Sequence, residues 1–140
     1  MTRPERGHRE LPHTADIRIQ AWGPTQESCL SEAVAALVAT FADVSGAREQ
    51  RCVEFDLGAD TEEEALLGTL DEVIYLLDTQ DVVPLGADVE RGAARLRVRM
   101  PVARVQDVDI VGAAPKAVAL HGLRFSHETG AWRCAVTIDV

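Results

Sequence analysis

Residues 16–22 read DIRIQAW and residues 25–41 read TQESCLSEAVAALVATF, and these two stretches decide the fold. In the first stretch apolar and polar positions alternate, with Ile17, Ile19 and Ala21 on one face and Arg18, Gln20 and Trp22 on the other. This period of two predicts a half-buried β-strand. In the second stretch apolar residues recur three and four positions apart, which predicts an amphipathic helix capped by Thr25 and ending near Ser45-Gly46.

The same two patterns continue along the chain. A second helix is predicted from Thr61, with Glu64 three residues on and an apolar stripe from Leu66 to Leu77. Further strands are predicted over residues 51–57, 82–89, 94–100, 116–125 and 131–139. Strand, helix, strand, helix and then several strands is an α/β (α+β) order. It predicts a two-layer sandwich in which two helices pack on one face of a mixed, mostly antiparallel sheet.

The length of 140 residues suits one compact domain. Residues 1–10 are charged and are expected to form a flexible tail, followed by a single domain over residues 11–140. No apolar stretch approaches the ~18 residues of a membrane helix, and no apolar segment follows the charged start as in a secretory signal. The sequence therefore predicts a cytoplasmic protein with no membrane partner.

The net charge of -9 opposes contact with a polyanion, so no direct, stable nucleic-acid binding is expected. An acidic chain suits a basic protein partner, or it simply keeps the protein soluble. Alternating Arg95, Arg97 and Arg99 form a basic row, which is expected to balance acids on a neighbouring strand rather than contact a partner or phosphates. Three widely spaced cysteines form no zinc motif and are expected to be buried thiols.

Motifs for self-sufficient catalysis are missing, since the sequence has no P-loop, GxGxxG, HExxH or GxSxG. An enzyme is therefore not expected. Asp16 opens the first predicted strand and Asp139 nearly closes the last, both on the face away from the apolar side chains. If these strands pair, the two carboxylates and the terminal carboxylate of Val140 converge, and all-oxygen ligands suit Ca²⁺, Mg²⁺ or Mn²⁺. The alternative is that both are ordinary solvated acids that never meet.

Four dispersed segments resemble the archease family, in the order and spacing expected of it. They are His13-Thr-Ala-Asp16, Leu70-Asp-Glu-Val-Ile-Tyr-Leu-Leu-Asp78, Lys116-Ala-Val-Ala-Leu-His-Gly-Leu123 and the ending Val136-Thr-Ile-Asp-Val140. Together they cover roughly residues 10–140, which makes the likeness far more specific than any single segment. The chain departs from the family pattern at Thr69, Asp71, Ala119 and Met100-Pro101.

The resemblance implies a two-layer α/β fold and a metal site at Asp16, Asp139 and Val140. It also implies an accessory protein that activates a GTP- and metal-dependent RNA ligase in tRNA splicing or RNA repair. Such a protein promotes guanylylation of the ligase and its multiple turnover. A divalent ion is the implied cofactor, with Ca²⁺ expected in vitro and Mg²⁺ or Mn²⁺ as alternatives.

His13, Lys116 and His121 are expected near this site, as groups that contact the partner or orient other residues. A lone histidine beside a strand end is more often a hydrogen-bonding scaffold residue, and that alternative stays open. Two rival functions also remain. One is a metal-binding chaperone or adaptor for another protein partner, and the other is a small metal-dependent hydrolase.

Overall fold

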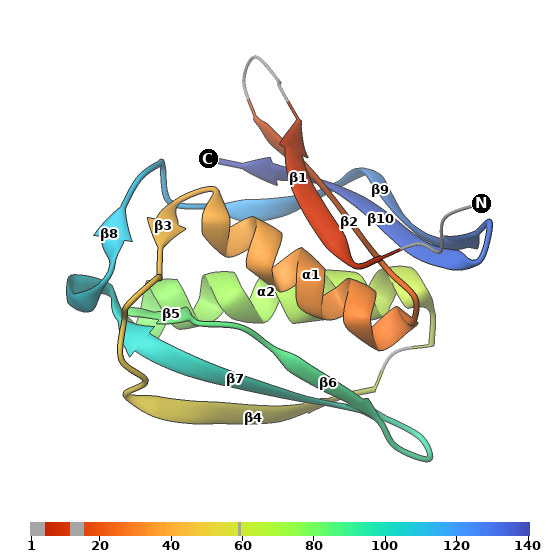
Figure 1. The fold of residues 1–140 in the computed structure, drawn as a ribbon, viewed down its shortest axis with the longest axis horizontal. Helices are drawn as coiled ribbons and strands as arrows, with labels where there is room; N and C mark the ends of the chain where they lie inside the picture. Colours follow the sequence, from red (N-terminus) through yellow and green to blue (C-terminus); the bar gives the residue numbers. More distant parts are fainter. Residues whose placement is uncertain (1–4, 12–15, 59) are drawn as a thin grey trace.

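The computed structural model describes residues 5–11, 16–58 and 60–140. Two helices lie between two groups of antiparallel strands, and each helix contacts strands of both groups (Figure 1). The elements are β1 (Gly7–Leu11), β2 (Ile17–Gly23), α1 (Gln26–Ala39), β3 (Ala42–Asp43), β4 (Arg51–Leu57), α2 (Glu62–Gln80), β5 (Val82–Pro84), β6 (Asp88–Arg91), β7 (Leu96–Arg104), a 3-10 turn (Val105–Asp107), β8 (Asp109–Ile110), β9 (Ala117–Glu128) and β10 (Ala131–Asp139).

The predicted α+β class, with two helices and mostly antiparallel strands, is confirmed. The strands were expected in one sheet, but hydrogen bonding divides them among three groups. A four-stranded sheet has the order β1-β2-β10-β9, a second group has the order β4-β7-β5 with β6 also on β7, and β3 pairs with β8. Every pairing between described strands is antiparallel.

Helix α1 begins as its sequence predicts and ends earlier. The Thr25 side chain accepts a hydrogen bond from the Ser28 backbone N–H at 3.0 Å, which caps the first turn. The predicted end near Ser45-Gly46 is wrong, because the helix stops at Ala39 and the Thr40 hydroxyl bonds back to a carbonyl of the last turn. Phe41 is still buried, but in the segment leading into β3 rather than on the helix.

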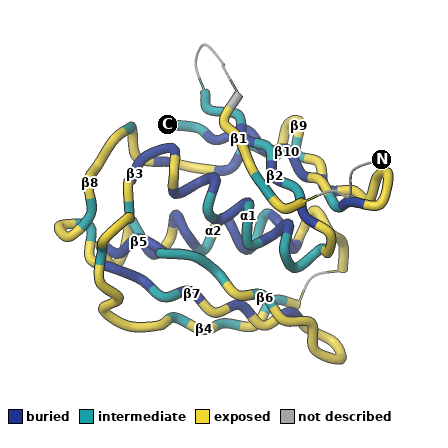
Figure 2. Tube along the Cα trace, viewed as in Figure 1, coloured by how far each residue is buried: buried dark blue, intermediate teal, exposed yellow. Residues whose placement is uncertain are grey.

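The core fills the space around the two helices, where Figure 2 shows the buried parts of the trace. Helix α2 buries most of its predicted apolar stripe, but Leu67 and Leu77 at the edges are only half-buried. Thr69 is fully buried, and its hydroxyl donates to the Ala65 carbonyl at 2.7 Å. That bond lets a polar side chain sit in the core. No helix among the described residues is both long and apolar enough to cross a membrane.

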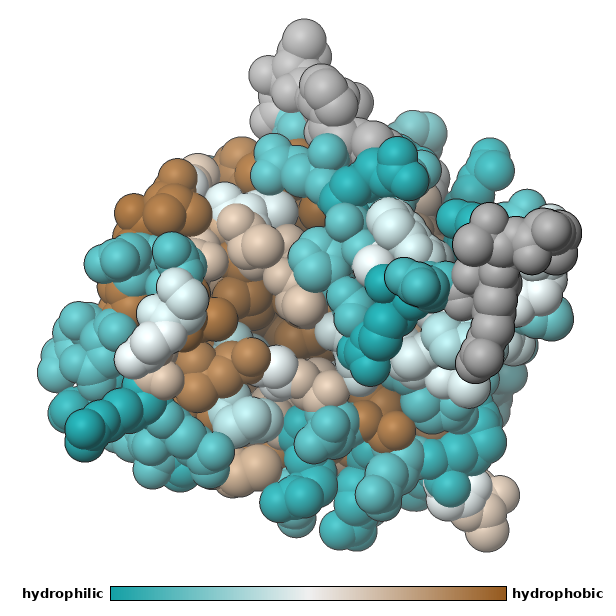
Figure 3. All heavy atoms as spheres, viewed as in Figure 1, coloured by the Kyte–Doolittle hydropathy of each residue, from teal (hydrophilic) through white to brown (hydrophobic). Residues whose placement is uncertain are grey.

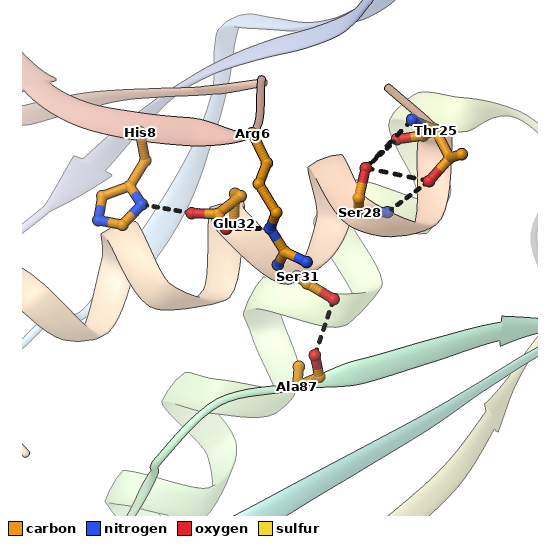
Figure 4. A network of polar contacts seen from close by, with 7 residues as sticks. All are labelled: Arg6, His8, Thr25, Ser28, Ser31, Glu32 and Ala87. Carbon is orange, nitrogen blue, oxygen red and sulfur yellow. Dashed lines mark hydrogen bonds and ion pairs between the residues drawn. The ribbon is translucent and has the colours of Figure 1, made fainter. Parts of the chain in front are cut away.

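The end of the predicted N-terminal tail is in fact a strand, since β1 pairs with β2 from Gly7 to Leu11. Glu32 on α1 holds this strand to the helix: Arg6 donates to one of its carboxylate oxygens and His8 Nδ1 lies 2.7 Å from the other (Figure 4). Burial acts to raise the pKa of Glu32, but the hydrogen bonds from His8 and Arg6 outweigh it and lower the pKa. The charge in this short segment therefore serves docking, which the prediction of a flexible tail overlooked for residues 7–10.

Cys29 and Cys134 are buried, as predicted, but Cys52 is exposed on β4. Hydrogen bonding to Cys134, together with burial, raises the pKa of the Cys29 thiol. Cys52 occupies a position on β4 that faces away from the helices, and alternation along residues 51–57 had already placed it opposite the apolar positions. The expectation of three buried thiols is thus wrong for Cys52.

Candidate functional site

The four-stranded sheet β1-β2-β10-β9 has one face against the helices and one face turned away from them, called here the outer face. On β2 the inward residues Ile19 and Ala21 are buried, and Arg18, Gln20 and Trp22 point outward. Because cross-strand partners share a face, the register extends the outer face to β10 and β9. Its rungs are Arg133 between Trp22 and Ser126, Ala135 between Gln20 and Arg124, Thr137 between Arg18 and Ala119, and Asp139 beside Ala117.

Asp16 and Asp139 lie at the same end of this sheet. Ile17 on β2 is the cross-strand partner of Ile138 on β10, and Asp16 and Asp139 are the next residues outward on the two strands. Both carboxylates are partly exposed, and neither forms an ion pair with a described residue. The expected pairing of the first predicted strand with the last is therefore found, although the chain adds β1 ahead of it.

Val140 and Lys116 are brought to the same end. The Lys116 backbone N–H donates to the Asp139 carbonyl at 2.7 Å, which fixes the backbone at the end of β10. The Val140 side chain is partly buried against the core, so the residue is held beside Asp139. The Lys116 side chain is exposed and extends from the strand entry.

His121 lies further along β9. The pairing of β9 with β10 shifts register between Ala135 and Thr137, and His121 is exposed in the part of β9 that spans this irregularity. Along the strand it is four residues beyond Ala117, the partner of Asp139. His121 thus shares a strand with the acidic end, and its role there stays a prediction. His13 lies outside the described residues.

The acidic end fits a hard cation in donor type. Asp16, Asp139 and the carboxylate of Val140 offer only oxygen atoms, the donors that Ca²⁺, Mg²⁺ and Mn²⁺ prefer. Within the described residues no group of three His, Cys, Asp or Glu side chains gathers in metal-binding geometry. Two side chains and one chain end can supply only part of a coordination shell of six or more oxygens, so water or a partner must complete it.

Sequence reasoning missed a row of arginines on the outer face. Arg18, Arg124 and Arg133 surround a hollow of about 260 Å3 above the small side chain of Ala135. Strand alternation places Arg18 and Arg133 on the outward face. Their proximity to Arg124, however, follows only from the register of three strands. The basic row on β7 behaves as predicted, because Arg97 and Arg99 pair with Glu54 and Asp56 of β4 at 2.6 to 3.9 Å.

A second hollow, of about 540 Å3, opens beside α1 between β3 and β5, where Figure 3 shows apolar side chains gathered. Its lining is largely apolar and includes Val38, Leu85 and Val111, the last of which is 61% exposed. Asp43 is the sole charged residue in the lining, all of which lies within the described part of the chain. One carboxylate with no basic neighbour in the lining makes neither a metal site nor a phosphate site.

Comparison with known proteins identifies the family. The family model described as "Archease protein family (MTH1598/TM1083)" matches residues 8–140. The curated "Probable protein archease" of Mycobacterium tuberculosis is 42% identical over 134 residues, which are 96% of this chain and 75% of that protein. "Protein archease" of Archaeoglobus fulgidus is 26% identical over 140 residues, covering 95% of this chain and 98% of that one.

Two solved structures share the fold. The solution structure of Methanobacterium thermoautotrophicum protein 1598 has a TM-score of 0.73 at 19% identity, covering 96% of this chain and 99% of its own. The crystal structure described as "an archease, possible chaperone" from Thermotoga maritima has a TM-score of 0.68 at 23% identity, covering 100% of this chain and 98% of its own. The resemblance inferred from four short segments is confirmed: this chain belongs to the archease family.

Proposed function

We propose that the protein activates a GTP- and metal-dependent RNA ligase, promoting guanylylation of the ligase and its multiple turnover in tRNA splicing or RNA repair. The observation that carries the proposal is the cross-strand pair Ile17–Ile138, which sets Asp16 beside Asp139 at the end of the sheet where the family resemblance expects a metal site. In this proposal the protein is an accessory factor, not an enzyme, and it works in the cytoplasm.

Asp16, Asp139 and the carboxylate of Val140 would hold the divalent ion, which supplies positive charge where the ligase meets this surface. The chain's own part is positioning. The hydrogen bond from Lys116 N–H fixes the carbonyl of Asp139, and the partly buried side chain of Val140 holds the chain end in place. The side chains of Lys116 and His121, with His13, would contact the ligase or orient its groups.

The experiment measures guanylylation of the RNA ligase from the same organism, with labelled GTP, in the presence of this protein. We expect the double variant Asp16→Asn, Asp139→Asn to lose activation, because it keeps the shape of both side chains and removes their charge. The matched control is Asp78→Asn, Asp88→Asn, which removes two charges at exposed positions elsewhere. Equal loss in both variants would point to net charge instead of a site, and full activation by the first would refute the proposed role of these acids.

A tag at the C-terminus tests the third ligand. Such a tag turns the Val140 carboxylate into an amide carbonyl and adds chain beside Asp139, whereas the buried residues of β10 stay unchanged. We expect the C-tagged protein to melt normally and to fail in activation, and a protein tagged ahead of Met1 to activate. Equal activation by both would rule out the free carboxylate as a ligand.

A second candidate function is a metal-binding chaperone or adaptor for a different protein. The description of the Thermotoga maritima relative as a "possible chaperone" supports this second candidate. It predicts that the variants at Asp16 and Asp139 lose metal binding, and that the protein has no effect on guanylylation even when intact.

A further inference from the structure

We propose that the outer face of sheet β1-β2-β10-β9 binds the phosphate groups of a single-stranded nucleic acid. This inference goes beyond the ligase partnership and does not depend on it. It concerns contact made by this protein alone, through arginines that lie further along the sheet than the acidic end.

The arginines are placed one to a rung. Arg18 belongs to the rung of Thr137, Arg124 to the rung of Ala135, and Arg133 stands on the next rung. Successive outward rungs are two residues apart along a strand, or about 6.6 Å. The three guanidinium groups come from three different strands and follow the direction of β10. A strand of nucleic acid lying along β10 therefore meets one cation at each step.

These cations form no ion pair with any residue that the structure describes. Across the described residues, seven ion pairs involve other basic groups, and none involves Arg18, Arg124 or Arg133. Arg18 donates instead to the neutral hydroxyl of Thr137 at 2.9 Å. One carboxylate, Glu128, lines the same hollow and accepts a hydrogen bond from Ser126 at 3.2 Å. In the lining of this hollow three unpaired cations stand against one acid, so the hollow is locally positive on a chain whose net charge is -9, and the acids Asp16 and Asp139 begin one rung beyond Arg18.

The hollow between the arginines has a definite floor. Ala135 is 8% exposed and lies between Gln20 and Arg124 in the register, so a small side chain is ringed by long polar ones. The volume of about 260 Å3 is below the ~300 Å3 at which pockets for whole small molecules begin. It therefore suits a short stretch of a longer ligand whose phosphates reach the surrounding arginines, rather than a whole small molecule.

An aromatic side chain lines the same hollow. Trp22 contributes to the lining, and the guanidinium carbon of Arg9 lies 5.0 Å from the centre of its ring. Aromatic rings and guanidinium planes both stack with nucleobases, and a groove that combines them with cations is typical of single-strand binding. An acidic peptide would use the cations but not the planar groups. The net charge keeps the contact weak, on the order of 10⁻⁴ M, in line with the expectation that no stable complex forms.

The test is fluorescence anisotropy of a labelled short oligouridylate titrated with the protein alone. Contact with three phosphates on a single strand predicts that affinity falls roughly twentyfold between about 50 and about 200 mM salt. In the variant Arg124→Gln, Arg133→Gln one contact remains, so the same change in salt weakens binding only about threefold. The control Arg97→Gln, Arg99→Gln removes the same charge from arginines that are paired with Glu54 and Asp56, and it should bind as the wild type does.

A second variant, which leaves the charge unchanged, tests the proposal even if the double arginine variant does not fold. Ala135→Leu fills the floor of the hollow and should weaken binding at least tenfold, with thermal melting as the folding control. No measurable binding of the oligouridylate, or equal salt dependence in the two arginine variants, would overturn the proposal. Equal binding of polyglutamate would overturn the nucleic-acid assignment, and equal binding of GTP would overturn the assignment to a strand. None of these outcomes bears on ligase activation, which is measured separately.

Discussion

The substitution Gly112→Ala tests the packing of the segment between β8 and β9. A Cβ atom at this position would lie 2.2 Å from the Thr40 carbonyl oxygen. An ordinary carbon–oxygen contact is about 3.4 Å, so the two backbones must separate by about 1.2 Å. The neighbouring Val111 N–H donates to the Phe41 carbonyl at 2.9 Å and would be strained by that movement. Overpacking costs about 1–3 kcal/mol and a weakened hydrogen bond about 1 kcal/mol, so we expect a loss of about 3 kcal/mol.

The matched control is the same substitution in helix α2, Gly68→Ala. Its Cβ would lie 2.6 Å from one terminal methyl of Leu57, the far end of a half-buried side chain. Moving that side chain off its rotamer costs about 1 kcal/mol. Alanine in place of glycine in a helix interior regains about as much, roughly 0.5–1 kcal/mol. The two effects nearly cancel, so the free energy of unfolding should change by under ~1 kcal/mol.

Both variants are measured by urea and thermal unfolding, followed by circular dichroism. For a chain of this size a loss of ~3 kcal/mol lowers the melting temperature by about 10 °C. Gly112→Ala should show such a drop with an unchanged urea m-value, and Gly68→Ala should melt within a few degrees of the wild type. Comparable stability of Gly112→Ala and the wild type would refute the backbone-contact argument. A loss in Gly68→Ala as large as that in Gly112→Ala would show that Leu57 cannot move.

Three further predictions concern charge. Calorimetry should show Ca²⁺ binding with a Kd of roughly 10⁻⁴–10⁻³ M, lost in the Asp16→Asn, Asp139→Asn variant, and equal binding by both proteins would exclude this site. Association with the RNA ligase should slow as salt rises, because a net charge of -9 steers a basic partner, and a rate independent of ionic strength would exclude steering. Glu32→Gln should lower stability by about 1 kcal/mol above pH 4.5, the ordinary pKa of the group. Since folding lowers the pKa of Glu32, this stabilisation is lost as the pH falls through the pKa of the folded state. Urea unfolding should therefore show the free energies of unfolding of the two proteins becoming equal in acid. A difference that stays constant with pH would contradict the argument.

Sequence periodicity predicted those elements whose burial is regular. β2, β4, β7 and both helices follow a period of 2 or 3.6 because each turns one face to the core. The pattern failed for β1, whose residues are mostly polar and whose place depends on Glu32, far away in the sequence. It also failed for β3 and β8, which are too short to show any period. Phe41 extended the apparent helix because burial beyond a helix end looks the same in sequence as burial along it.

The candidate site was predictable to the extent that it depends on neighbouring strands. Strand alternation put Asp16 and Asp139 on the outward face, and the archease-like ending suggested that they meet. The observed register of β2 and β10 agrees with this. The position of His121 was not predictable, because Gly122, with a φ of 75°, marks an irregularity in β9 but does not say how far the register shifts there. Predicting the row of Arg18, Arg124 and Arg133 would have required the register of all three strands that carry them. Arg124, in particular, stands beside Arg18 only because β10 lies between their strands.

That central place of β10 also governs when the protein can fold. β10 follows every other described element in the sequence, yet it lies between β2 and β9 and pairs with both. During translation β2 and β9 must wait with open edges until residues 131–139 leave the ribosome, and contacts such as Arg18 with Thr137, 119 residues apart, close last. Folding dominated by such distant pairings is slow, and open strand edges invite aggregation. A nascent chain interrupted before β10 would thus be left for chaperones or proteases, and no partial product could carry the paired acids.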